Sequence, residues 1–164
     1  VVSDTAHRNS GFKVSMVHNS PEAGTSMHEG WALGNSVFTE SAELYDLIYS
    51  SFKDYRAESA QIAQLLRSID PSYHRLLDVG CGTGEHAYLL TTQYGFAVDG
   101  LDIDPAFVRI AQHKSPAGRF VEADMSDFNL GAHYDAVLCL FSSIGYVKTL
   151  ARVERTLRRW STLR

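Results

Sequence analysis

A glycine-rich segment joins a short apolar run to a helical pattern near the middle of the chain. It reads Asp78-Val-Gly80-Cys-Gly82-Thr-Gly84, with glycines at alternate positions. Glycine lets the backbone turn sharply and come close to a ligand. A helix that starts directly after such a segment points its first N–H groups at the same place. The segment therefore predicts a ligand-binding loop, and a tight turn that binds nothing is the alternative.

Two further carboxylates follow the next two apolar runs. Asp102 closes the second run, roughly 20 positions after the loop, where a carboxylate can accept hydrogen bonds from both hydroxyls of a ribose. Asp124 closes the third run, where it can accept from the exocyclic amine of an adenine. A helix cap and a turn residue are the respective alternatives. Because the carboxyl ends of parallel strands meet at one edge of a sheet, the three strand ends together predict one ligand crevice.

Two ligands that contain adenosine, NAD and S-adenosylmethionine, are candidates for such a crevice. The dinucleotide fingerprint G-x-G-x-x-G/A, counted from Gly80, requires a small residue at position 85. That position holds Glu85, whose bulk and charge oppose a pyrophosphate. S-adenosylmethionine (SAM) is the better expectation, because its amino-acid and sulfonium end replaces the phosphates. Asp78 can orient its ammonium group, directly or through water, and an NAD-dependent enzyme is the disfavoured alternative.

The same residues resemble a known family. The stretch 76–84 is similar to motif I of the class I SAM-dependent methyltransferases, and Gly100-Leu-Asp102 and Ala123-Asp-Met125 resemble the two segments of that family that bind adenosine. The resemblance covers about residues 40 to 147. It implies an α/β, Rossmann-like fold with a parallel sheet and helices on both faces.

A narrower resemblance lies in three shorter stretches. Tyr45-Asp-Leu-Ile-Tyr49, Lys53-Asp-Tyr55 and Phe141-Ser-Ser-Ile-Gly-Tyr146 are similar to N,N-dimethyltransferases that act on nucleotide-linked deoxyamino sugars of the desosamine and mycaminose type. This implies transfer of a methyl group to the amino group of such a sugar, in antibiotic biosynthesis. A Tyr-Asp-x-x-Tyr start is shared with other small-molecule methyltransferases, so another small acceptor and a non-catalytic SAM-binding fragment are the alternatives.

The resemblance also implies roles for individual residues. Tyr45 would line the acceptor pocket near the methyl group, with core packing on an amphipathic helix as an equal alternative. Tyr55 would contact the methionyl end of SAM, and Leu140 would lie near its sulfonium. Cys81 is expected to be a small loop filler rather than a nucleophile. The full set expected to bind the cofactor is Tyr55, Asp78, Gly80, Cys81, Gly82, Gly84, Asp102, Ile103, Asp124, Met125 and Leu140.

Methyl transfer from a sulfonium is an in-line displacement, in which the protein mainly supplies proximity and alignment. An amine must lose its proton before it attacks, and water can accept that proton. The seven histidines are scattered without the spacing of metal ligands, so no metal site is expected.

Alternating strand and helix patterns must position these residues. Hydrophobic periodicity and turn signals predict a parallel sheet with helices on its faces. The predicted helices cover 40–50, 55–69, 85–94, 104–114 and 150–160, and the predicted strands cover 75–80, 96–102, 119–123 and 134–141. Asp54 and Asp104 are the expected N-caps of two of the helices. Residues 1–36 read as an irregular lead-in, and 37–164 as the SAM-binding domain.

Composition narrows the class of protein. The 164 residues are 45% apolar and 21% charged, as in a soluble globular domain, and the net charge of −4 argues against a nucleic-acid partner. No apolar run approaches the roughly 18 residues that cross a bilayer. Cys81 and Cys139 are too far apart to suggest a disulfide framework, so a cytoplasmic location is expected.

The chain supplies four of the seven strands that the family would contain. The fourth predicted strand would then be an exposed edge, which invites pairing with another chain. The sequence therefore predicts either a fragment of a longer protein or a homodimer that covers this edge. The basic tail, with Arg152, Arg155 and Arg158 among its cations, is read as a solvated helical face, with an acidic partner or a sugar diphosphate as the alternative.

Overall fold

The computed structural model describes residues 53–141 and 143–163. The predicted lead-in over 1–36 and the predicted helix over 40–50, which carries Tyr45, lie outside these residues. The domain boundary at residue 37 therefore stays a prediction.

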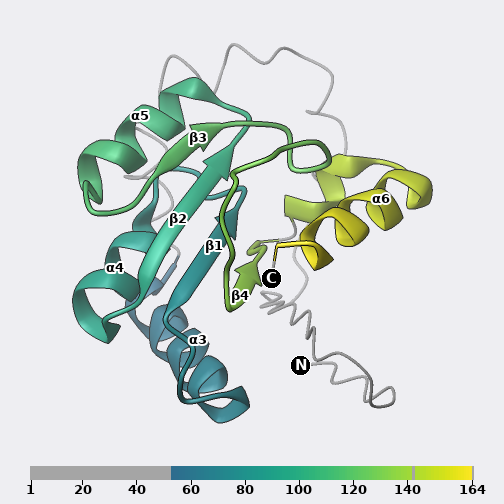
Figure 1. Ribbon diagram of the computed structural model, residues 1–164. Coiled ribbons are helices and arrows are strands. Elements are labelled where there is room, and N and C mark those ends of the chain that lie inside the picture. The colour runs from purple at the N-terminus through teal and green to yellow at the C-terminus, as the bar shows by residue number, and fades with distance from the viewer. Residues whose placement is uncertain (1–52, 142, 164) are drawn as a thin grey trace, which may run out of the picture.

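Within the described residues, four parallel strands form one sheet in the order β3-β2-β1-β4 (Figure 1). The strands are β1 (Arg75–Val79), β2 (Ala97–Asp102), β3 (Phe120–Glu122) and β4 (Ala136–Leu138). The helices are α3 (Tyr55–Ile69), α4 (Glu85–Tyr94), α5 (Pro105–Lys114) and α6 (Leu150–Ser161), with a 3-10 helix, η1 (Ser143–Val147). This arrangement confirms the predicted α/β class.

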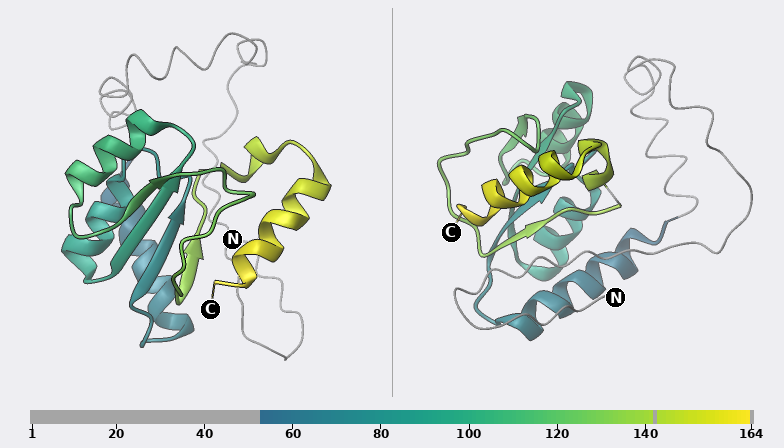
Figure 2. Two further views of the ribbon diagram at one scale, coloured as in Figure 1. Left: turned by 45° about the horizontal axis from the view of Figure 1, so that its top comes forward. Right: turned by 90° about the vertical axis from the view of Figure 1, so that its right-hand side faces the viewer.

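Helices cover both faces of the sheet, and the left view of Figure 2 shows α6 on the side opposite the other three. Residues of α3, α4 and α5, among them Leu66, Leu90 and Ala111, share one buried cluster with Leu76 of β1. Trp160 of α6 belongs to the cluster on the opposite face. Alternate residues of β1 thus enter opposite cores, as the two-residue period of a strand requires. No helix among the described residues is long and apolar enough to cross a membrane.

Local capping explains where the helices begin. The Asp54 carboxylate accepts from the backbone N–H of Ala57, and the Asp104 carboxylate accepts from that of Ala106, as the sequence predicted. Thr149 caps α6 in the same way, which the sequence analysis did not identify.

The fourth strand is shorter than predicted. The prediction of 134–141 fails at both ends, because the pairing with β1 covers only Ala136–Leu138. At the start, the backbone N–H of Tyr134 donates to the carbonyl of Leu163, after α6, and not to a strand. At the end, Phe141 has a φ of 55°, which stops extended backbone, and η1 follows. The apolar pattern of the sequence reveals neither the hydrogen bond to Leu163 nor the left-handed backbone at Phe141.

Gly84 and Gly95 bracket α4 with left-handed backbone, at φ values of 77° and 75°. They differ in their surroundings. A Cβ on Gly84 would lie 2.8 Å from the Cβ of Ala111 in α5, whereas a Cβ on Gly95 would have no neighbour within 4 Å. Gly84 therefore permits both the turn and the close approach of α4 to α5.

Substitution of these two glycines by alanine separates the two demands. We expect Gly84→Ala to lower the free energy of unfolding by about 2–4 kcal/mol, because backbone strain and overpacking add. Gly95→Ala should cost about 1 kcal/mol, from strain alone. Urea denaturation followed by circular dichroism measures both variants, and equal losses would show that the contact with Ala111 is unimportant.

Candidate functional site

The glycine loop is fixed to the second strand at the carboxyl edge of the sheet. The backbone N–H groups of Gly80 and Cys81 both donate to the carbonyl of Leu101, over 2.8 and 3.0 Å. The backbone N–H of Gly82 donates to Oδ2 of Asp102 over 2.8 Å. The structure therefore brings together the loop and the second-strand aspartate that the sequence singled out.

Asp102 is largely buried, and its other oxygen, Oδ1, accepts from the backbone N–H of Asp104 over 3.0 Å. Burial raises the pKa of this carboxyl, and the hydrogen bonds from Asp104, Gly82 and Ile103 oppose that rise. Each carboxylate oxygen can accept more than one hydrogen bond. Asp102 can thus support the loop and still accept from the hydroxyls of a ribose.

Asp78 is a buried carboxyl whose Oδ1 atom has no hydrogen-bond partner among the described residues. The residue is 2% exposed. Burial, with the nearby charge of Asp102, raises the pKa of Asp78 to about 7. Buried acceptors without a partner are rare in native proteins. The oxygen at the start of the glycine loop therefore marks a place for a donor from outside the described residues.

The loop itself leaves room for a ligand at Gly82. A Cβ there would have no atom within 4 Å, and φ is 54°. Cys81 is buried, and burial raises the pKa of its thiol well above the usual range, which suits the expected filler role. The Glu85 carboxylate faces α5, where it forms an ion pair with Lys114 over 2.9 Å. The Glu85 side chain thus points to α5 and not to the place at the glycine loop where a pyrophosphate was expected to meet it.

Ile103 and Met125 lie just after the carboxyl ends of β2 and β3, at the edge of the sheet where the crevice was predicted. Ile103 is 71% exposed directly after Asp102, which is unusual for a large apolar side chain. Met125 lies after β3 and is half-buried, and its methyl group lies 3.8 Å from the position that a Cβ on Gly80 would take. These contacts place the turn after β3 beside the glycine loop. Ile103 thus leaves an apolar side chain exposed at the carboxyl end of β2.

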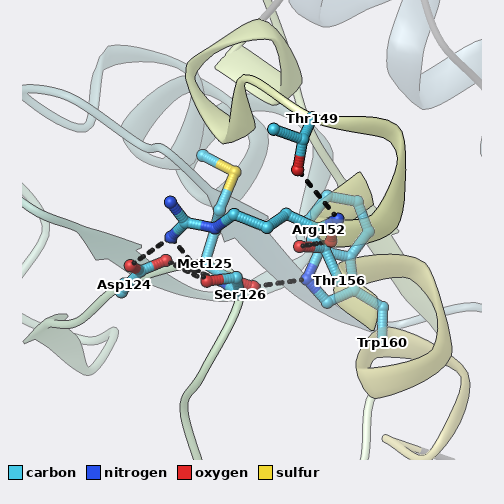
Figure 3. Close-up of polar contacts among 7 residues, drawn as sticks. All are labelled: Asp124, Met125, Ser126, Thr149, Arg152, Thr156 and Trp160. Carbon is cyan, nitrogen blue, oxygen red and sulfur yellow. Dashed lines mark hydrogen bonds and ion pairs between the residues drawn. The ribbon is translucent and has the colours of Figure 1, made fainter. Parts of the chain in front are cut away.

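Asp124 does not stand alone at this edge. Its Oδ1 accepts from the backbone N–H and the hydroxyl of Ser126, over 2.8 and 2.7 Å. Its Oδ2 accepts from Nη2 of Arg152 over 3.3 Å, a contact that Figure 3 displays. The hydrogen bonds from Ser126, and to a smaller extent the charge of Arg152, lower the pKa of Asp124. This link could not be predicted from the sequence, because Arg152 and Asp124 are 28 positions apart and no motif connects them.

Tyr55 opens α3 and lies against a histidine that the sequence analysis treated as scattered. The rings of Tyr55 and His86 meet edge to face with their centroids 5.0 Å apart. Nε2 of His86 lies 3.1 Å from Oε2 of Glu58. Burial, with the charge of Lys53, lowers the pKa of His86 to about 4, so the imidazole is neutral and shares a hydrogen bond with the Glu58 carboxyl. This pair ties α3 to the first turn of α4.

Phe141 completes the same corner, and the strand pattern gave no signal for it. Its ring centroid lies 5.0 Å from that of His86, and the ammonium group of Lys53 lies over its ring. Burial lowers the pKa of Lys53 to about 8, and the charge of Glu58 opposes this. Leu140, in contrast, is buried in the core with Ile62 and Ala87.

The arginines of α6 mostly have intramolecular partners. Arg158 pairs with Glu154 one turn before it, and Nε of Arg159 donates to the carbonyl of Phe128 over 2.7 Å. Arg152, through its ion pair with Asp124, and Arg159 thus bind α6 to the rest of the domain, whereas Arg158 pairs within the exposed part of the helix. In the described part of the chain, no group of three or more His, Cys, Asp or Glu residues could hold a metal ion.

The chain matches a model of a known protein family. Residues 76–162, more than half of the chain, match the methyltransferase domain model. The chain is 41% identical over 123 residues to a dTDP-3-amino-3,6-dideoxy-alpha-D-glucopyranose N,N-dimethyltransferase of Streptomyces fradiae, which covers 74% of this chain and 48% of the relative. It is 41% identical over 111 residues to a dTDP-3-amino-3,4,6-trideoxy-alpha-D-glucopyranose N,N-dimethyltransferase of Streptomyces venezuelae, covering 67% of this chain and 46% of the relative.

Solved structures agree with this match. DesVI of Streptomyces venezuelae superimposes with a TM-score of 0.69 at 37% identity, covering 74% of this chain and 52% of that one. The SAM-bound amino pentose methyltransferase CalS10 of Micromonospora echinaspora gives a TM-score of 0.68 at 36% identity, covering 73% and 51%. The chain spans about half the length of the curated relatives that it matches. By its glycine loop, its sheet order and the family model, the chain belongs to the methyltransferase domain family.

Proposed function

We propose that this chain binds SAM and forms the cofactor half of a methyltransferase for the amino group of a nucleotide-linked deoxyamino sugar. The observation that carries the cofactor assignment is the buried Oδ1 of Asp78 beside the glycine loop, which has no hydrogen-bond partner among the described residues. An ammonium group is the donor that would satisfy it and stabilise its charge. The amino-acid end of SAM carries such a group.

The remaining residues divide the cofactor among them. Asp102 accepts from the ribose hydroxyls while it holds the N–H of Gly82. Ile103 covers one face of the adenine, and Asp124, after β3, accepts from the adenine amine. Tyr55, held by His86, closes the methionyl end. When bound, SAM supplies a methyl group on a positively charged sulfur, and the chain contributes alignment and the exclusion of water.

The acceptor assignment rests on the relatives, whose printed names specify dTDP-linked amino sugars. Tyr45, outside the described residues, is proposed to line the acceptor pocket. We also propose that the enzyme works in the cytoplasm, in antibiotic biosynthesis. Two copies would pair through β4, which among the described strands contacts β1 alone. Because the chain spans about half of its relatives, a SAM-binding segment without turnover is the second candidate, and another small acceptor is the third.

Binding of S-adenosylhomocysteine tests the cofactor assignment. We expect Asp102→Asn to weaken this binding about ten-fold or more, because the amide cannot accept all the hydrogen bonds of the carboxylate. Asp127→Asn is the matched control, since Asp127 lies exposed at the same edge of the sheet. Isothermal titration calorimetry measures both variants, with NAD as the control ligand. Tight binding of NAD, or equal effects of the two substitutions, would contradict the assignment.

The pH dependence of binding tests Asp78. Its carboxyl has a pKa of about 7 when buried, and only the ionised form attracts the ligand ammonium. The affinity for S-adenosylhomocysteine should rise by up to about ten-fold per pH unit towards pH 7 and then level off. Asp78→Asn should bind weakly at every pH. A wild-type affinity that does not change with pH would argue against contact between Asp78 and the ammonium.

The same carboxyl should affect stability with a defined sign. An unfolded Asp ionises near pH 3.9, so between that pH and about 7 only the native state keeps the proton. Stability should therefore fall as the pH rises through this window. Asp78→Asn should be more stable than the wild type at pH 8, by on the order of 1 kcal/mol or more. Thermal unfolding of both proteins at pH 5 and pH 8 measures this difference.

Turnover separates the enzyme from a binding segment. We expect the chain, given SAM and dTDP-3-amino-3,6-dideoxyglucose, to yield a methylated sugar detectable by mass spectrometry. The matching sugar nucleotide with a hydroxyl in place of the amine should not react. Binding of S-adenosylhomocysteine without methylation of the amino sugar would favour the second candidate.

A further inference from the structure

One face of α6 holds the turn that follows β3, as Figure 3 shows. Arg152 and Trp160, two turns apart on the helix, both contact this turn. Nη2 of Arg152 reaches Oδ2 of Asp124 and the hydroxyl of Ser126, each over 3.3 Å. The indole N–H of Trp160 donates to the carbonyl of Met125 over 3.2 Å. Thr156, between them, donates its hydroxyl to the carbonyl of Arg152 and so stays within the helix.

These contacts fix the orientation of the Asp124 carboxylate. Ser126 holds Oδ1 from one side, and Arg152 holds Oδ2 from the other. With both oxygens engaged, rotation of the carboxylate would break at least one of these bonds. The side chain remains 43% exposed, so its free lone pairs can meet a ligand. Its lowered pKa keeps it ionised, which makes it an acceptor at neutral pH.

We propose that Arg152 is a positioning residue that sets Asp124 to accept from the amine of the adenine. The proposal rests on the SAM-binding function proposed above. An ionised carboxylate can accept from the amine of adenine but meets repulsion from the 6-oxo group of hypoxanthine. Arg152 therefore contributes to the choice between adenine and hypoxanthine.

The experiment compares two ligands on the whole chain. Calorimetry gives the dissociation constants of S-adenosylhomocysteine and S-inosylhomocysteine, in which a 6-oxo group replaces the amine and ring N1 carries a proton. The wild type should prefer the adenine ligand. Arg152→Gln should weaken binding of the adenine ligand about three- to five-fold, the upper part of the range that exposed ion pairs cover, and should change binding of the inosine ligand less than two-fold. The ratio is taken within one variant, so a general loss of stability does not move it.

Two further variants provide controls. Arg155→Gln removes the same charge from an exposed position on the same helix and should leave both constants unchanged. Arg152→Lys keeps the charge but loses the two-pronged donor, so it should fall between the wild type and Arg152→Gln. If Arg152→Gln does not fold, Arg152→Lys against Arg155→Gln decides the question.

The outcomes separate the two proposals. An unchanged ratio in Arg152→Gln, or tighter binding of the adenine ligand, overturns the role of Arg152, and the latter would mean that Arg152 competes with adenine for Asp124. Equal binding of both ligands by the wild type overturns the role of Asp124 as well but leaves the SAM site standing. Failure of the wild type to bind either ligand overturns the proposed function, and this inference falls with it.

Discussion

The hydrogen bond from the backbone of Gly82 to the carboxylate of Asp102 is the contact on which the site depends. It joins the loop after the first strand to the end of the second. The two neighbouring bonds to the carbonyl of Leu101 hold the start of the same loop. Because both partners of each bond belong to the chain, the protein itself supplies the arrangement of the loop, which reduces the conformational entropy lost on binding. The direction of α4 follows from the same arrangement.

Asp78 shows the opposite relation between stability and function. Its carboxyl is buried with an oxygen that no described residue satisfies, and that burial raises its pKa to about 7. Such an arrangement destabilises the free chain, because a buried polar atom without a partner loses its hydration and gains nothing. Perturbed groups of this kind cluster at functional sites. The core around it, from Leu76 to Leu90, supplies the apolar burial that tolerates this cost.

The two faces of the sheet contribute different parts of the site. On one face, the pair of His86 and Glu58 joins α3 to α4 and presents the ring of Tyr55. On the other, α6 packs on the sheet through Trp160 and holds the turn that carries Asp124. The binding site predicted at the carboxyl edge lies between these two supports. Its shape is therefore sensitive to the packing of helices that contribute no glycine-loop residue.

The sequence by itself determined the order of strands and helices, the glycine loop and the caps at Asp54 and Asp104. These depend on periodicity and turn chemistry within a few residues, and such short-range signals can be read from the chain. Only the tertiary structure decided the short β4 and the pairing of Arg152 with Asp124. It also decided that Glu85 pairs with Lys114 and that His86 pairs with Glu58. Each of these contacts joins segments far apart in the sequence, and their geometry exists only once the helices have packed on the sheet.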